Sequence, residues 1–242
     1  MQIGELSERE CATRLADGMR FALGPFVVDL ISDVPGFSRT FRACYSASPL
    51  LPSPGISHFS IEVRTRRGLR SLLGRQQVEF LLEGIAPFEP YPVDHAFPMF
   101  EWGLNWCIAN TAHQYVMLHA AAVEFHEHTV IMPAQPGAGK STLCAGLVSC
   151  GWRLFSDEFG LLRPADGRLQ AMPRAIPLKN ESIAVMQDFA PRMQYGPVYD
   201  KTRKGRVCHV FPREDSLANQ ATPGTPRMIV FPLYRRDAAT AL

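Results

Sequence analysis

The stretch VIMPAQPGAGKSTLCAGL, residues 130–147, places a glycine-rich turn between an apolar segment and a segment typical of a helix. The apolar residues before the turn predict a strand, and residues of about 141–150 predict a helix. The next apolar segment, WRLFSDE (152–158), predicts a second strand. A strand that passes through a glycine-rich loop into a helix, and then into another strand, indicates an α/β nucleotide-binding unit.

The composition of the loop predicts contacts with phosphate. Gly137, Ala138 and Gly139 are small enough for the main chain to curl and point its N–H groups at an anion. Lys140 supplies a positive charge for the outer phosphates, and the Ser141 hydroxyl can bind the Mg²⁺ ion that bridges them. We therefore expect ATP and Mg²⁺ as cofactors. The full pattern G-x-x-x-x-G-K-[ST] has glycine at position 134, where this chain has alanine, which can replace it if φ is negative there or if the loop relaxes slightly.

Acidic residues and a histidine flank the predicted loop. SDE (156–158) ends the second strand, and His119 lies in LHAAAVE, within the first of two strands predicted at 115–125 and 129–134. An acidic residue beside a phosphate loop can hold magnesium or accept a proton from an attacking hydroxyl. The pattern therefore favours phosphoryl transfer to an alcohol. Taken alone, a histidine on an apolar strand also fits a hydrogen-bonded core residue.

In order and spacing, LHAAAVEFHEHTVIMPAQPGAGKSTLCAGLVSCGWRLFSDEFGLL resembles the catalytic core of the HPr serine kinase/phosphorylases. In that family a Leu-His-Gly strand, a G-x-x-G-x-G-K-S loop and an Asp-Asp pair follow one another. The segments FEWGLNWCIANTAHQYVMLHAA, GWRLFSDE and IPLKNESI are most similar to the branch called HprK-related kinase A. The resemblance to this branch covers most of the chain, and the resemblance to the HPr kinases themselves covers about residues 115–165.

The resemblance implies a P-loop kinase core that transfers the γ-phosphate of ATP to a serine hydroxyl of a protein or peptide other than HPr, and it implies a homo-oligomer. It assigns nucleotide and magnesium binding to Gly137, Gly139, Lys140, Ser141 and Thr142. It makes Asp157 the general base, and Glu158 a metal ligand or orienting group in place of the family's second aspartate. His119 would steer the acidic pair or contact the γ-phosphate. The chain lacks the Glu-Ile-Arg-Gly segment of the family's reverse reaction, so we do not expect phosphorylase activity.

Two further segments carry candidate cations. MPRAIPLKN (172–180) contains Arg174 and Lys179, which could reach the phosphates or the acceptor. DKTRKGRVCHVFP (200–212) contains Lys204 and is expected to form a flexible cationic loop that closes over the triphosphate or attracts an acidic acceptor. We include Lys179 and Lys204 among the nucleotide-binding residues. Charges on a solvated surface are the alternative for both segments.

The rest of the chain predicts a second, smaller unit. Residues 1–92 suggest a β-rich α+β module with a helix near 35–46 and a basic run at 64–75 that fits a solvated surface. Its predicted strands lie within residues 20–31, 56–66 and 77–84. The prolines of APFEPYP (86–92) mark a boundary, after which residues 93–242 form the catalytic domain, beginning with a buried helix. The module has no chemistry of its own and would select the acceptor.

Composition limits the partners and the location. The net charge of the 242 residues is only +2, which gives no reason to expect nucleic acid as a partner. No segment has the run of apolar residues that a membrane span needs, and the N-terminus lacks the pattern of a signal peptide. The six cysteines are scattered and indicate free thiols in a reducing cytoplasm.

Two alternatives to a kinase remain open from the sequence. Ala134 and Glu158 depart from the family pattern, and these departures favour an ATP-binding regulatory or assembly protein that transfers nothing. An NTP hydrolase, with water as the acceptor, could use the same carboxylate as its base.

Overall fold

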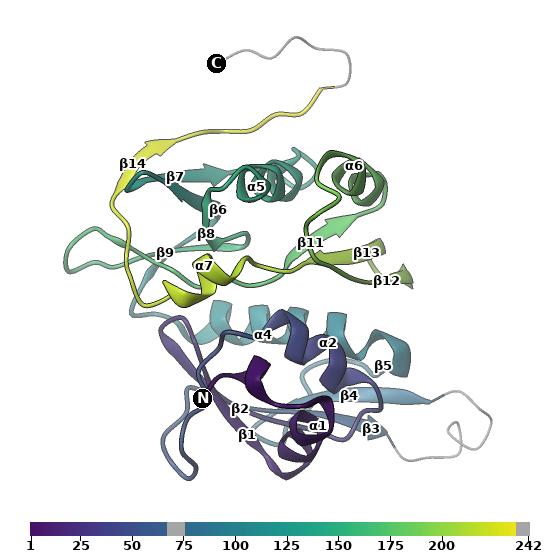
Figure 1. Ribbon diagram of the computed structural model, residues 1–242. Coiled ribbons are helices and arrows are strands. Elements are labelled where there is room, and N and C mark those ends of the chain that lie inside the picture. The colour runs from purple at the N-terminus through teal and green to yellow at the C-terminus, as the bar shows by residue number, and fades with distance from the viewer. Residues whose placement is uncertain (67–75, 236–242) are drawn as a thin grey trace.

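The chain has a mixed α/β fold in two halves, and helix α4 lies between them (Figure 1). The computed structural model describes residues 1–66 and 76–235, so most of the basic run at 64–75 lies outside the described residues. No helix in the described ranges combines the length and the apolar character that a membrane crossing requires.

The first half is built on a five-stranded sheet with the order β1-β2-β3-β4-β5. Its strands are β1 (Met19–Leu23), β2 (Phe26–Ser32), β3 (Phe59–Arg66), β4 (Gln77–Leu82) and β5 (Tyr91–Pro92). Strands β2 and β3 pair in parallel and the other neighbours are antiparallel. The strands predicted at 20–31, 56–66 and 77–84 are confirmed.

Two helical segments precede the sheet in the chain, η1 (Ile3–Glu5) and α1 (Glu8–Asp17). A third, α2 (Phe37–Cys44), lies in the connection between the parallel strands β2 and β3. The helix predicted near 35–46 is α2. Helix α1 was not predicted, although Ser7 and Glu10 form a capping box that satisfies the first N–H groups of the helix.

Helix α4 (Ala96–Thr111) follows the short η2 (Val93–His95) and is apolar on nearly all sides. A helix of this kind must be covered all round. One side packs on β3, β4 and β5, and the other faces the second half (Figure 1). The prolines of 86–92 place α4 in the catalytic domain by sequence, whereas its contacts place it on the first sheet.

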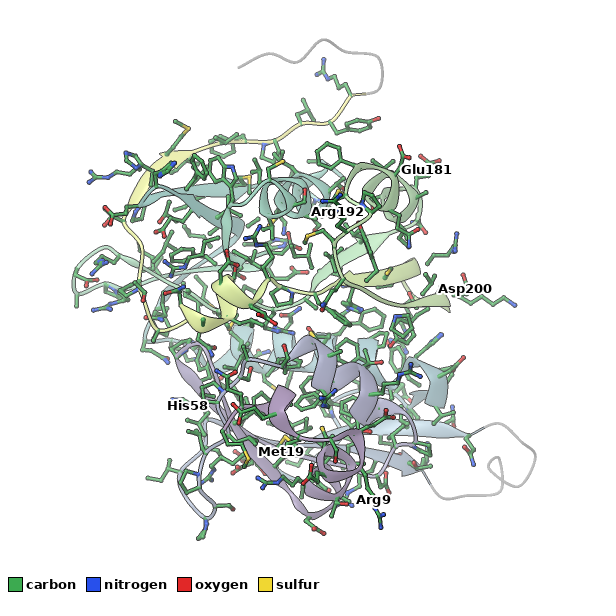
Figure 2. All side chains as sticks on the ribbon, in the orientation of Figure 1. Arg9, Met19, His58, Glu181, Arg192 and Asp200 are labelled. Carbon is green, nitrogen blue, oxygen red and sulfur yellow. The ribbon has the colours of Figure 1, made fainter. Side chains whose placement is uncertain are left out.

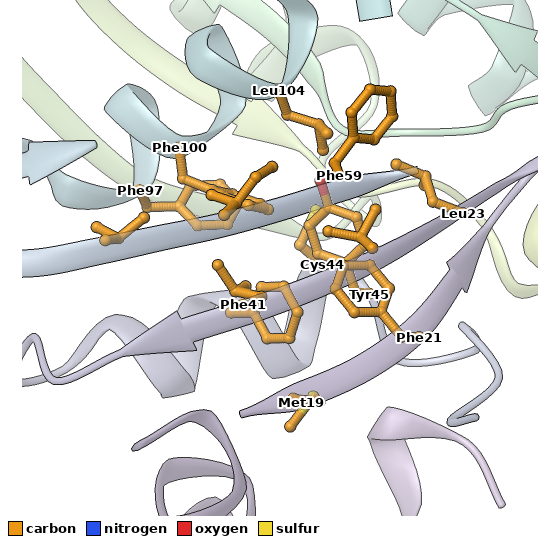
Figure 3. Close-up of a cluster of buried hydrophobic side chains, with 14 of the residues drawn as sticks. Met19, Phe21, Leu23, Phe41, Cys44, Tyr45, Phe59, Phe97, Phe100 and Leu104 are labelled. Carbon is orange, nitrogen blue, oxygen red and sulfur yellow. The ribbon is translucent and has the colours of Figure 1, made fainter. Parts of the chain in front are cut away.

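The core of the first half is aromatic and continues into the second half. Phe21, Phe41, Tyr45 and Phe100 meet edge to face or stacked, with ring centroids 4.9–5.9 Å apart (Figure 3). The same cluster of buried side chains includes Leu161, Met172, Ala175 and Phe211 from the second half. Side chains therefore fill the interval between the halves (Figure 2), and the two halves share one core.

The second half contains a six-stranded sheet. Its strands are β6 (Val116–Phe125), β7 (His128–Pro133), β8 (Arg153–Ser156), β9 (Phe159–Leu162), β10 (Leu169–Gln170) and β14 (Pro226–Ile229). Strand β6 pairs with β7 on one side and with β9 and then β8 on the other, always antiparallel. Strands β7 and β8 consequently run in the same direction and end at the same edge of the sheet.

Helix α5 (Lys140–Ser149) covers one face of this sheet. Its other side meets α6 (Glu181–Phe189) and the three-stranded sheet β11-β13-β12. That sheet consists of β11 (Ile176–Lys179), β12 (Tyr195–Thr202) and β13 (Gly205–Val210), and the short α7 (Glu214–Ala218) follows it. Alternate residues of β6 face opposite ways: Ala121 and Val123 pack with α5, and Ala120 and Ala122 with Phe155.

Gly103 allows α4 to lie close to the first sheet, and we expect Gly103→Ala to destabilise the protein by about 1–3 kcal/mol. A Cβ atom at this position would lie 2.2 Å from the ring of the buried Phe80. The matched control is Gly146→Ala in α5, where a Cβ would meet only the Phe189 ring at 3.8 Å and the free energy of unfolding should rise by up to about 1 kcal/mol. Urea unfolding of both variants measures the difference. Equal stability of the two variants would contradict this account of the contact.

Candidate functional site

The glycine-rich loop occupies residues 134–139, between the end of β7 and the first turn of α5. Gly137 and Gly139 have φ angles of 86° and 88°, which other residues rarely adopt. A Cβ atom at Gly137 would meet nothing within 4 Å, so the loop presents an open main-chain surface there. Ala134 is not among the residues with positive φ, so its backbone meets the condition under which alanine can replace the glycine of the pattern.

Lys140 and Ser141 both contact Asp157, which follows β8. The Lys140 ammonium group donates a hydrogen bond to the main-chain oxygen of Asp157 and lies 3.4 Å from Asp157 Oδ1. Ser141 Oγ donates to Asp157 Oδ2 at 2.7 Å. The contacts arise because β7 and β8 end at the same edge of the sheet. Thr142, next in the helix, is half-buried beside them.

The Asp157 carboxylate is almost fully buried, with 2 % of its side chain exposed. Burial raises its pKa above the ordinary value of 3.8, Lys140 and the Ser141 hydrogen bond act in the opposite direction, and the charge of Glu158 adds to the rise. Oδ2 accepts the hydrogen bond of Ser141, and Oδ1 makes no hydrogen bond within the described residues but is ion-paired with Lys140 at 3.4 Å. The carboxylate is therefore held between the lysine and the serine that follow the glycine-rich loop.

Glu158 faces a different neighbour, His119. His119 Nε2 lies 3.5 Å from Glu158 Oε2, and 60 % of the histidine side chain is exposed. The reading of His119 as a core residue is therefore excluded. Ser141 and Glu158 are the metal ligands predicted from sequence, but the carboxylate beside Ser141 is that of Asp157. The two acidic side chains diverge because they are consecutive residues of the bend between β8 and β9.

Lys204 lies close enough to Lys179 and to Glu158 for the charge of each to act on it. Burial and the charge of Lys179 lower the pKa of Lys204, and Glu158 opposes them. The Lys204 ammonium group lies 5.3 Å from the centre of the Trp102 ring on α4. The prediction of a flexible loop at 200–212 is wrong, because β12 and β13 form a hairpin here.

A small cavity adjoins Asp157 on the side of α4. Its walls include Asp157, Glu158, Trp102, Asn105, Arg174 and His209. The volume of the cavity is about 20 Å³, roughly the room that one water molecule needs. The cavity therefore joins the catalytic candidates to residues from both halves of the chain.

Arg174 forms one wall of this cavity through a buried ion pair. Its guanidinium group lies 2.6 Å from Glu101 Oε2, donates a second hydrogen bond to the Glu101 main-chain oxygen, and donates a third to Asn105. The residue is 7 % exposed, so it is not a charge on the solvated surface. These bonds connect α4 to the segment before β11.

The C-terminal part of the described chain passes beside the glycine-rich loop, as the yellow segment of Figure 1 shows. Strand β14 pairs in parallel with β7, and the main-chain N–H of Tyr234 donates to Ala138 at 3.1 Å. A Cβ atom at Gly139 would lie 3.1 Å from Tyr234 Cβ, a tight contact, and the φ of 88° at this position also favours glycine.

Sequence reasoning missed Glu101, Asn105 and His209 as site residues. Glu101 and Asn105 stand four residues apart in an otherwise apolar helix, a spacing that places both on one face. His209 interrupts the apolar strand VCHVF. Polar residues at apolar positions were therefore the available signal. Comparison with models of known protein families and with curated proteins gives no match to the chain.

Proposed function

We propose that the protein is an ATP-dependent kinase that phosphorylates a serine hydroxyl of a protein or peptide. The observation that supports this most strongly is the convergence of Lys140, Ser141 and Asp157 where β7 and β8 end, beside a small cavity. The arrangement fits a P-loop core of the HPr kinase type, as the resemblance in sequence implies.

The phosphates of ATP would bind to the main chain of the glycine-rich loop and to Lys140. The N–H groups of the first turn of α5 and its helix dipole favour an anion at this end. Lys204, on which the charges of Lys179 and Glu158 both act, would add positive charge at the margin of the site together with Lys179.

The residues present fit a Mg²⁺ ion. Ser141 Oγ and Asp157 Oδ2 lie 2.7 Å apart, and both are the hard oxygen ligands that Mg²⁺ takes together with phosphate oxygens. Ser141 and Asp157 would hold the ion, which would neutralise the charge of the phosphate oxygens. Glu158, paired with His119, would add negative charge beside them.

The same carboxylate can serve the acceptor. As the acceptor oxygen attacks the γ-phosphorus, Asp157 Oδ1 takes the hydroxyl proton, the bond from phosphorus to the bridging oxygen breaks, and ADP leaves with that oxygen. The raised pKa of Asp157 makes it a stronger base than an exposed aspartate. The first half of the chain, through α4, would select the acceptor.

Lys140→Ala tests the nucleotide site. We expect the dissociation constant for MgATP to rise about tenfold or more, which corresponds to at least about 1.4 kcal/mol, because the variant loses the cation nearest the loop. Titration with a fluorescent ATP analogue measures the change. Arg9→Ala is the control, since Arg9 lies at the far end of the first half (Figure 2). Unchanged affinity in Lys140→Ala would place the nucleotide elsewhere.

The reaction assay separates the three candidate activities. Labelled ATP with protein or peptide acceptors should give a phosphoserine product. Binding that depends on Lys140 without any product would favour the regulatory alternative, and phosphate release in the absence of an acceptor would favour the hydrolase.

A further inference from the structure

The segment after β14 borders the glycine-rich loop on the side away from Asp157. Strand β6, which pairs with β8, lies on one side of β7, and β14 lies on the other. Strand β14 runs parallel to β7, so the two strands end at the same edge of the sheet. Residues 230–235 continue from this edge past the loop (Figure 1). The loop therefore lies between Asp157, which follows β8, and the segment that follows β14.

Tyr234 is fixed to the loop through its main chain, while its ring stays open. Its N–H donates to the Ala138 main-chain oxygen at 3.1 Å, and its Cβ lies 3.1 Å from the place that a Cβ on Gly139 would take. The residue is nevertheless 71 % exposed. Among residues 1–66 and 76–235, no hydrogen bond of its hydroxyl and no ring or cation contact of its ring is found. An aromatic face is thus held beside the loop without a partner in the described chain.

The proposed nucleotide site sets the direction in which a bound nucleotide runs. Lys140, Ser141 and Asp157 would act on the outermost phosphate and on the acceptor, so the γ-phosphate belongs at their side of the loop. The nucleoside is attached at the other end of the chain of phosphates. That end lies toward the segment after β14, where the Tyr234 ring is exposed.

An exposed aromatic ring beside a phosphate loop suits a nucleobase. Every base presents a flat π-face, and stacking on tyrosine requires no particular pattern of donors and acceptors. Leu143, one helical turn beyond Gly139, is 39 % exposed and adds apolar surface to this part of α5. The chemistry that fits both the loop and the ring is a flat aromatic group joined to phosphates.

We propose that the Tyr234 ring stacks on the base of the nucleotide whose phosphates bind residues 137–141. The inference rests on the proposed nucleotide site and adds a residue from a distant part of the chain to it. Tyr234 binds the base and takes no part in phosphoryl transfer. Because stacking reads the face of the base and not its edge, the contact serves adenine and guanine alike.

Calorimetric titration of the full chain with Mg²⁺ and either ATP, GTP or inorganic tripolyphosphate tests the contact. Tyr234→Ala should raise the Kd for ATP and for GTP about tenfold and leave the Kd for tripolyphosphate within about twofold. Tyr234→Phe, which keeps the ring, should bind as the unaltered protein does. The matched control is Phe231→Ala, which removes another exposed aromatic ring from the same segment and should leave all three affinities unchanged. Unchanged affinity for ATP in Tyr234→Ala, or an equal loss of affinity for tripolyphosphate, overturns the inference.

The ring signals of Tyr234 report the stacking directly. In protein with ¹³C-labelled tyrosine, the signals that are lost in Tyr234→Phe should move upfield on saturation with a non-hydrolysable ATP analogue, because the base lies over the ring. They should stay in place with tripolyphosphate. Signals that do not move upfield with the ATP analogue overturn the contact.

The same measurements separate this inference from the proposals on which it rests. ATP affinity that depends on Lys140 but not on Tyr234 overturns the stacking contact and leaves the nucleotide site standing. ATP that does not bind at all contradicts both. Binding that depends on Tyr234, without any phosphorylated product, supports the contact and counts against the kinase.

Discussion

Asp157→Asn is expected to lower the rate of phosphoryl transfer by roughly 10²–10⁴-fold, the range that a positioned general base contributes. The amide oxygen can still accept the hydrogen bond of Ser141 and can still ligate Mg²⁺, so MgATP should bind. The amide cannot take up the acceptor proton. A single-turnover assay with labelled ATP, combined with a separate measurement of MgATP affinity, distinguishes the two effects.

Glu158→Gln is the matched control for this variant. It removes the adjacent carboxylate by the same chemical change, but Glu158 is 27 % exposed and its partner His119 is largely exposed. Its effect should be about tenfold or smaller, because a solvated pair contributes little. If the two variants lose activity equally, or if Asp157→Asn keeps its activity, Asp157 is not the base.

The dependence of kcat/KM on pH is a second test of Asp157 as the general base. A base must be ionised to accept a proton, so kcat/KM should fall as the pH falls through the pKa of Asp157. Burial raises that pKa, Lys140 opposes the rise, and a bound Mg²⁺ ion would oppose it further, so the test is the presence of the acidic limb and not its position. The limb should be absent from the residual activity of Asp157→Asn. A limb that persists in the variant belongs to another group.

The fold could be predicted from sequence where periodicity was strong. The short apolar strand β2, in which buried and half-buried residues alternate, and the apolar run of α4 gave clear patterns. Strands β11 and β12 gave none, because Pro177 and Pro197 lie within them. Both are edge strands of the sheet β11-β13-β12, where a missing N–H is tolerated. Only the three-dimensional order of the strands shows this.

Some residues of the candidate site could likewise be predicted from sequence, and others could not. Lys140 and Ser141 follow the loop directly, and Asp157 follows the next strand, so local order was enough to select them. The residues that line the cavity could not be selected in this way. Asn105, Arg174 and His209 come from three parts of the chain more than thirty residues apart in sequence. No spacing rule connects such residues. The sequence also could not show which of the two acidic residues, Asp157 or Glu158, turns toward Ser141.

Arg174→Met should lower the free energy of unfolding by about 3–5 kcal/mol, the usual cost of removing one partner of a buried ion pair. Glu101 would remain 3 % exposed without its cation, Tyr45 would still donate to it, and Asn105 Oδ1 would lose the hydrogen bond that Arg174 donates. Methionine keeps most of the side-chain volume, so the loss reports the charge and not a cavity. Urea unfolding with linear extrapolation measures it.

Two comparisons make the cause of that loss testable. Arg206→Ala removes an exposed arginine that lies 2.9 Å from Asp200, and its effect should stay within about 0.5 kcal/mol, because water screens the pair. The double variant Glu101→Met with Arg174→Met should be more stable than Arg174→Met alone, since no buried charge is left uncompensated. A double variant that is less stable than the single one would mean that Glu101 stabilises the interface between α4 and the second half by itself, and the ion pair would then not be what joins the two halves at this point.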